Sequence, residues 1–120
     1  MKKFFDKNGD YFYFAFRVIV GVLFILHGWM KLGMFKADPI SLMALAFLIE
    51  VIGGLFIVVG AFVRCTAVIA GIEMIFAYFM AHAGTALSPL ANKGEPAVLF
   101  FAAFLVLAAF GARKWALKSD

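Results

Sequence analysis

Two glutamates, Glu50 and Glu73, each lie near the middle of a long apolar run. A charge at the centre of a bilayer costs at least about 2.5 kcal/mol, so each acid needs a partner or a proton. Arg17, in the first apolar run, is the cation that we predict to face Glu50 in the bundle interior. Two carboxyl groups and one guanidinium cannot all be charged comfortably in a low dielectric, so one acid should stay protonated or share a proton. We therefore assign Arg17, Glu50 and Glu73 to a catalytic, proton-handling group; the alternative is a buried ion pair that only fixes helix register.

A second group of polar residues lies nearer one membrane surface than the two glutamates. We assign this group to cofactor binding, and its members are His27, Lys31, His82 and Glu95. An imidazole can donate a hydrogen bond to a carbonyl oxygen, so His27 suits a quinone head group, with Phe24 and Trp29 as walls for the ring. The alternatives are an ordinary hydrogen-bonding histidine, or a haem held between His27 and His82. No metal site is predicted, because the sequence contains no zinc-ligand spacing, and a serine triad and a Gly-rich phosphate loop are equally absent.

The composition predicts an integral membrane protein with a single domain over residues 1–120. Of its 120 residues, 66% are hydrophobic and only 15% are charged, and the mean hydropathy is +1.03. A soluble domain of this length could not cover so much apolar surface with so few charges. The basic residues flank the apolar runs, which indicates orientation in a bilayer rather than nucleic-acid binding. The single cysteine, Cys65, excludes an internal disulfide.

Four apolar segments are long enough to cross the hydrocarbon core as helices, so we expect an all-α, antiparallel four-helix membrane bundle. Asp38 and Pro39 read as an N-cap followed by proline at the first helical position, and Glu95 and Pro96 repeat that pattern. The predicted helices span residues of about 11–32, 39–61, 64–84 and 96–112.

Charge at the segment ends predicts the orientation. With four spans, both termini and the second loop share one side, which carries seven cations: Lys2, Lys3, Lys7, Arg64, Arg113, Lys114 and Lys118. The other side carries three, which are Lys31, Lys36 and Lys93. Because basic loops stay inside, we predict a multi-pass plasma-membrane protein with both termini in the cytoplasm.

Small residues share a helix face with each candidate charge. The stripe of the first segment contains Arg17, Gly21, Phe24, Gly28 and Lys31; that of the second contains Glu50, Gly53, Gly54, Ile57 and Ala61; that of the third contains Ala70, Glu73, Ala77 and Ala81. Since small residues let transmembrane helices approach closely, we expect the first segment to pack on the second and third through these stripes.

Taken together, these segments resemble the DoxX family of small four-helix membrane proteins over nearly the whole chain. The resemblance is carried by RVIVGVLFILHGWMKL in the first segment, EVIGGLFIVVGAFVR in the second, Glu73 and Met74 in the third, Glu95 at the start of the fourth, and the ending GARKWALKSD. It implies an association with membrane oxidoreductase systems, including quinone-linked thiosulfate oxidation and thiol or oxidative-stress complexes. With no cysteine pair, this chain would supply a quinone pocket or a docking surface rather than exchange disulfides.

Three functions stay open at this point. The first is a membrane subunit of a quinone-linked oxidoreductase system, which could assemble with other redox-complex proteins or with itself. The second is a small proton-coupled transporter; an arginine rather than an acid in the first helix, and the clear charge bias, argue against it. The third is a structural membrane partner with no chemistry of its own.

Overall fold

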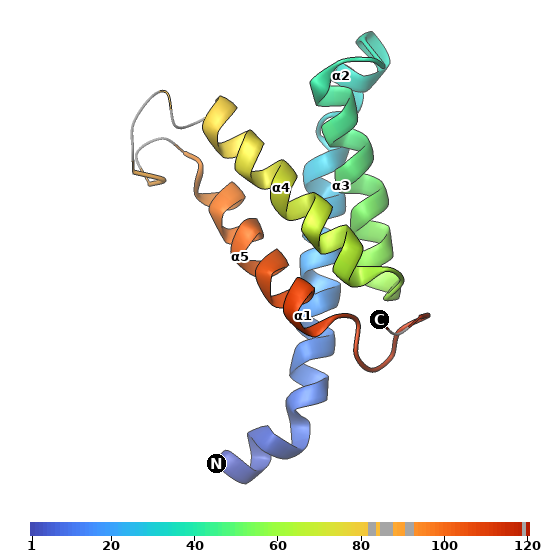
Figure 1. Ribbon diagram of the computed structural model, residues 1–120, viewed down its shortest axis with the longest axis vertical. Helices are drawn as coiled ribbons and strands as arrows, with labels where there is room; N and C mark the ends of the chain where they lie inside the picture. Colours follow the sequence, from blue (N-terminus) through green and yellow to red (C-terminus); the bar gives the residue numbers. More distant parts are fainter. Residues whose placement is uncertain (82–83, 85–87, 91–92, 119) are drawn as a thin grey trace.

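The computed structural model describes residues 1–81, 84, 88–90, 93–118 and 120, and over these residues its regular secondary structure consists of helices without strands (Figure 1). The helices are α1 (Lys2–Trp29), α2 (Leu32–Ala37), α3 (Leu42–Val59), α4 (Val63–Ala81) and α5 (Glu95–Phe110). The four longer helices alternate in direction, and both chain ends lie at the end of the bundle where α3 and α5 finish. The prediction of an all-α antiparallel bundle is confirmed.

Three of these helices are long and apolar enough to cross a membrane: α1, α3 and α4. The fourth, α5, is apolar but has 16 residues, so it extends for only about 24 Å. Large apolar side chains cover the outside of the helices, among them Ile19, Leu45 and Phe76, which are 58%, 53% and 61% exposed. Such a surface requires lipid, so the chain is a helical membrane bundle.

Several helix boundaries differ from the predicted ones. The first helix begins at Lys2 rather than near residue 11, because its N-terminal turns continue beyond the apolar run. The second long helix is capped by Ser41, whose hydroxyl accepts a hydrogen bond from the Ala44 amide at 3.1 Å, so the predicted cap at Asp38 is wrong. Pro96 does lie in the first turn of α5, where its missing amide hydrogen costs nothing, but the N-cap is Gly94, so the predicted cap at Glu95 is wrong.

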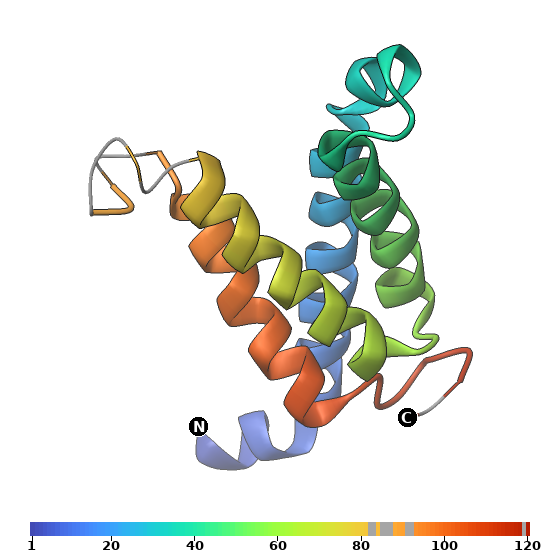
Figure 2. The same cartoon turned by 45° about the horizontal axis from the view of Figure 1, so that its top comes forward.

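The long helices form two pairs, α1 with α3 and α4 with α5, which diverge toward one end of the bundle (Figure 2). Glycines make the first pair close: a Cβ on Gly54 would lie 2.7 Å from the Gly21 carbonyl oxygen. The predicted contact between these two stripes is confirmed. The expectation that α1 also packs on α4 through the stripes is wrong, because α4 packs mainly on α5: the Phe101 ring and the Phe104 Cβ of α5 lie against Gly71 of α4.

After α5, the chain folds back beneath the ends of α3 and α4. The amides of Leu117 and Lys118 donate to the carbonyls of Val59 and Gly60 at 2.9 and 3.0 Å. The Asp120 carboxylate accepts from the Arg64 amide at 2.9 Å, in the first turn of α4. A negative charge at a helix N-terminus is favourable, so the Asp120 carboxylate stabilises the start of α4. The segment thereby covers the end of the bundle where α3 ends and α4 begins.

Candidate functional site

The charged pair inside the bundle is formed by Lys31 and Glu50. The Lys31 ammonium lies 2.8 Å from Glu50 Oε1, and the two side chains are 20% and 2% exposed. Gly28 permits this approach, because a Cβ there would lie 2.7 Å from the Glu50 Cβ. Lys31 sits in the turn after α1, and its long stem allows the charged head to reach inward. Glu50 is thus stabilised by a cation that the sequence analysis assigned to the outer group.

Arg17 does not pair with Glu50, so that prediction is wrong. The fully buried Arg17 guanidinium donates five hydrogen bonds to backbone carbonyls, at 2.6–3.3 Å. Their acceptors are Ile57 and Val58 at the end of α3, and Ala112, Lys114 and Trp115 in the C-terminal segment. These acceptors on α3 begin seven residues beyond Glu50, which is about 10 Å along a helix. Carbonyls at a helix C-terminus carry partial negative charge, so they balance the cation without an acid.

Glu73 joins Glu50 and Lys31, as its place in the middle of α4 predicts. Its carboxyl group lies close to that of Glu50. Its Oε1 atom is buried and has no hydrogen-bond partner within the described part of the chain. Two carboxyl groups form a hydrogen bond only when one of them carries a proton, because a carboxylate has nothing to donate. We call Lys31, Glu50 and Glu73 the polar cluster.

His27 lies one turn before Lys31 and is half-buried. Its ring meets the ring of Phe100 on α5 edge-on, with 5.0 Å between centroids. The predicted walls beside it are wrong: Phe24 is fully buried against Phe104, and the Trp29 ring lies toward Phe47 of α3. His27 therefore borders the polar cluster along α1 and faces Phe100 of α5.

The remaining assigned residues do not enlarge the site. Glu95 is exposed in the first turn of α5, and in the described ranges no ion pair or hydrogen bond joins it to Lys31 or Glu50. His82 lies outside the described residues, and with it the proposed haem pairing. Within the described residues there is no group of three or more His, Cys, Asp or Glu side chains that could hold a metal ion.

Two apolar grooves lie on the helix surfaces. One, of about 250 Å³, is lined by Leu48, Ile49, Ile52, Gly53, Phe56, Thr66 and Ile69 of α3 and α4. The other, of about 180 Å³, is lined by Met74, Ile75, Tyr78, Phe79, Ala97, Val98 and Phe101 of α4 and α5. Ligand pockets usually measure about 300–1,000 Å³, and neither groove is lined by the polar cluster or His27. Neither groove therefore provides a quinone-sized pocket around the charged residues.

Comparison with known proteins places this arrangement in a family. The family model described as DoxX matches residues 12–83, a range that includes Arg17, His27 and the whole polar cluster. A Haemophilus influenzae protein, described only as uncharacterized, is 35% identical over 128 aligned residues, which cover 95% of this chain and 93% of that relative. No solved structure matches this chain.

Sequence reasoning found each member of the polar cluster but not its pairing. The pairing of Lys31 with Glu50 could have been predicted from the stripe that Gly28 and Lys31 share. A glycine at position 28 lets α3 approach α1 closely, which brings Glu50 within reach of Lys31. The backbone acceptors of Arg17 carried no such signal, because three of them belong to an irregular segment after α5.

Proposed function

Because this chain belongs to the DoxX family of membrane proteins, we propose that it is a membrane subunit of an oxidoreductase system in which the polar cluster takes up and releases a proton. The observation that carries the proposal is the buried Glu73 Oε1 atom, which has no partner among the described residues although it lies beside the Lys31–Glu50 pair. An acceptor left open inside an apolar bundle is costly, so a proton or a ligand donor that fills it is strongly favoured.

The charges of the cluster account for one exchangeable proton. With Lys31 charged and Glu50 ionised, the ion pair is neutral, and a protonated Glu73 keeps the whole cluster neutral. Loss of that proton leaves a net charge of −1 in a medium of low dielectric, where it is poorly solvated. The cluster therefore holds its proton until a basic acceptor approaches, which is the behaviour required of a general acid.

The proposed redox partner is a quinone dissolved in the lipid. A quinone is an apolar ring with two carbonyl oxygens, and the half-buried His27 is the nearest donor to the cluster on α1 that does not belong to it. Since His27 lines neither of the two grooves, the head group would lie against the side of the bundle near Phe100 rather than inside it. Other redox proteins, or a second copy of this chain, would supply the remaining wall.

The proposed location is the plasma membrane, with both termini in the cytoplasm. Seven cations at the end that carries the termini, against three at the other, support this orientation. The polar cluster would then open toward the outer leaflet.

Thermal unfolding in detergent with added ubiquinone, menaquinone or menadione analogues tests the quinone partner. We expect an analogue to raise the melting temperature of the wild type, and His27→Ala and Glu50→Gln to reduce that rise. Glu95→Gln is the matched control, because it removes an exposed acid outside the cluster. If no analogue raises the melting temperature of the wild type, the protein is not a quinone-binding subunit, and a structural membrane partner is the better description.

A proton-coupled transporter is the second candidate, favoured by a polar cluster whose two glutamates belong to different helix pairs, Glu50 to the α1–α3 pair and Glu73 to the α4–α5 pair. Vesicles containing the purified protein and a pH-sensitive dye distinguish the two. A transporter dissipates a pH gradient when its substrate is added and loses this ability in Glu73→Gln, whereas a redox subunit holds the gradient.

A further inference from the structure

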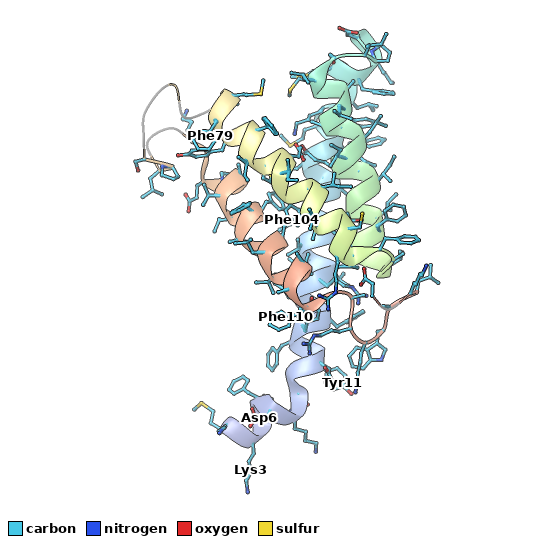
Figure 3. The ribbon with its side chains drawn as sticks, viewed as in Figure 1. Lys3, Asp6, Tyr11, Phe79, Phe104 and Phe110 are labelled. Atoms are coloured by element: carbon cyan, nitrogen blue, oxygen red, sulfur yellow. The ribbon has the colours of Figure 1, made fainter. Side chains whose placement is uncertain are left out.

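The first eleven residues of α1 extend beyond the rest of the bundle. Figures 1 and 2 both show these turns bending away from the axis of the remaining helix, and Figure 3 labels Lys3 and Asp6 on the protruding part. Gly9 lies within this stretch and has no side chain within 4 Å of its Cβ position, so no neighbouring element packs there. We call residues 2–12 the N-terminal foot.

The foot has an aromatic face and a charged face. Phe4, Phe5 and Phe12 form one cluster, with ring centroids 5.3–6.4 Å apart, and they are 58%, 48% and 52% exposed. Lys3 and Lys7 are four residues apart and therefore lie together, on a different side of the helix from Phe5 and Phe12. An exposed helix with rings on one side and lysines on the other is typical of segments that lie in the membrane interface.

The C-terminal segment adds cations and aromatic rings at the same end. Lys114 pairs with Asp10 of the foot at 3.1 Å, and Trp115 stacks on Tyr11 with 5.0 Å between centroids. Arg113 lies over the Phe110 ring at 4.8 Å. Tryptophan, tyrosine and long basic side chains concentrate at the level of lipid head groups, so this end of the bundle lies at that depth.

Charge at this end favours an anionic partner. Seven cations stand there against three acids, which are Asp6, Asp10 and Asp120. Two of these acids are already occupied, Asp10 by Lys114 and Asp120 by the Arg64 and Ala112 amides. Lys2, Lys3 and Lys7 are exposed and make no ion pair within the described residues.

We propose that the N-terminal foot lies flat in the head-group layer and binds anionic phospholipids. The phenylalanine cluster enters the boundary between head groups and acyl chains, and the lysines contact lipid phosphates. Lipid is the occupant because a free phosphate would leave the exposed rings in water, whereas a lipid offers both an anion and an apolar surface. The proposal stands apart from the redox function, since the foot contains none of the polar cluster.

Native mass spectrometry of the full chain in detergent, with equal amounts of phosphatidylglycerol and phosphatidylcholine of the same acyl chains, tests this site. Each lysine near an anionic surface contributes about fivefold in binding. We expect the wild type to retain phosphatidylglycerol preferentially, and the double variant Lys3→Gln, Lys7→Gln to lose at least fivefold of that preference. The matched control is Lys36→Gln, Lys93→Gln, which removes two exposed cations from the other end and should leave the preference unchanged.

Salt provides a second measurement that does not depend on any variant. Raising the ionic strength should release phosphatidylglycerol from the wild type before phosphatidylcholine, because only the charged lipid is held by screened interactions. Equal retention of the two lipids, or a preference that the Lys3 and Lys7 substitutions leave intact, would overturn the proposal.

Discussion

The bundle contains two buried charged centres that are built on opposite principles. At the end that carries the termini, the Arg17 guanidinium uses its donors on five backbone carbonyls and needs no acid. In the other half, Lys31, Glu50 and Glu73 combine two acids with one cation and leave a buried oxygen without a partner among the described residues. Both centres bury a charge. The Arg17 centre has its hydrogen bonds filled and suits stability, whereas the polar cluster has an unfilled acceptor and suits chemistry.

Removing the arginine should give the largest effect. Arg17→Met leaves five carbonyls without their donor and detaches the C-terminal segment, so we expect a loss of about 3–5 kcal/mol in the free energy of unfolding. Reversible unfolding in mixed micelles measures it. Arg113→Met is the control, because it removes an exposed cation at the same end. Its free energy of unfolding should stay close to that of the wild type. Because Arg17 is not paired with Glu50, its effect should add to that of Glu50→Gln; a strong coupling between the two would show that our description of Arg17 is wrong.

Filling the space beside the polar cluster should give the second largest loss of stability. Gly28→Ala puts a methyl group 2.7 Å from the Glu50 Cβ and 2.9 Å from a Val51 methyl, so α1 and α3 must separate. Overpacking of this kind costs about 1–3 kcal/mol. Gly33→Ala is the control, because nothing lies within 4 Å of its Cβ position. Equal melting temperatures for the two variants would mean that the cluster tolerates a wider helix contact than the structure has.

The Lys31–Glu50 pair should show coupling that Arg17 and Glu50 lack. Lys31→Met leaves a buried carboxylate without its cation and should cost about 1–3 kcal/mol. Combining it with Glu50→Gln removes both charges, so the double variant should be more stable than the sum of the single changes by about 1 kcal/mol or more. A double-mutant cycle on the unfolding free energy gives this number. Additive effects would show that Lys31 and Glu50 do not form a stabilising ion pair.

Glu73→Gln should have the smallest effect on stability. The amide has the size of the carboxyl group and can donate to Glu50, so we expect the free energy of unfolding to change less than in Lys31→Met. Its effect should appear instead in proton exchange, because an amide does not titrate. A large loss of stability would indicate that Glu73 is a packing residue rather than a proton carrier.

The sequence predicted the parts of this arrangement that follow from periodicity. The stripe of Glu50, Gly53 and Gly54 placed the acid inside the bundle, and the position of Glu73 in its apolar run placed it beside Glu50. The Arg17 partners could not be predicted, because hydropathy and charge say nothing about carbonyl groups in a chain that folds back after α5. Lys31 was assigned to the outer surface because depth was counted at the Cα atom, whereas its stem carries the ammonium inward to Glu50.

Infrared difference spectroscopy of the protein in lipid, recorded across a pH titration, tests the central claim most directly. A protonated carboxyl group inside the bundle gives a carbonyl stretching band that differs from that of a carboxylate. We expect the wild type to show one such band that disappears in Glu73→Gln and persists in Glu95→Gln. A band that is unchanged in Glu73→Gln, or the absence of any protonated carboxyl band at neutral pH, would contradict a proton held between Glu50 and Glu73.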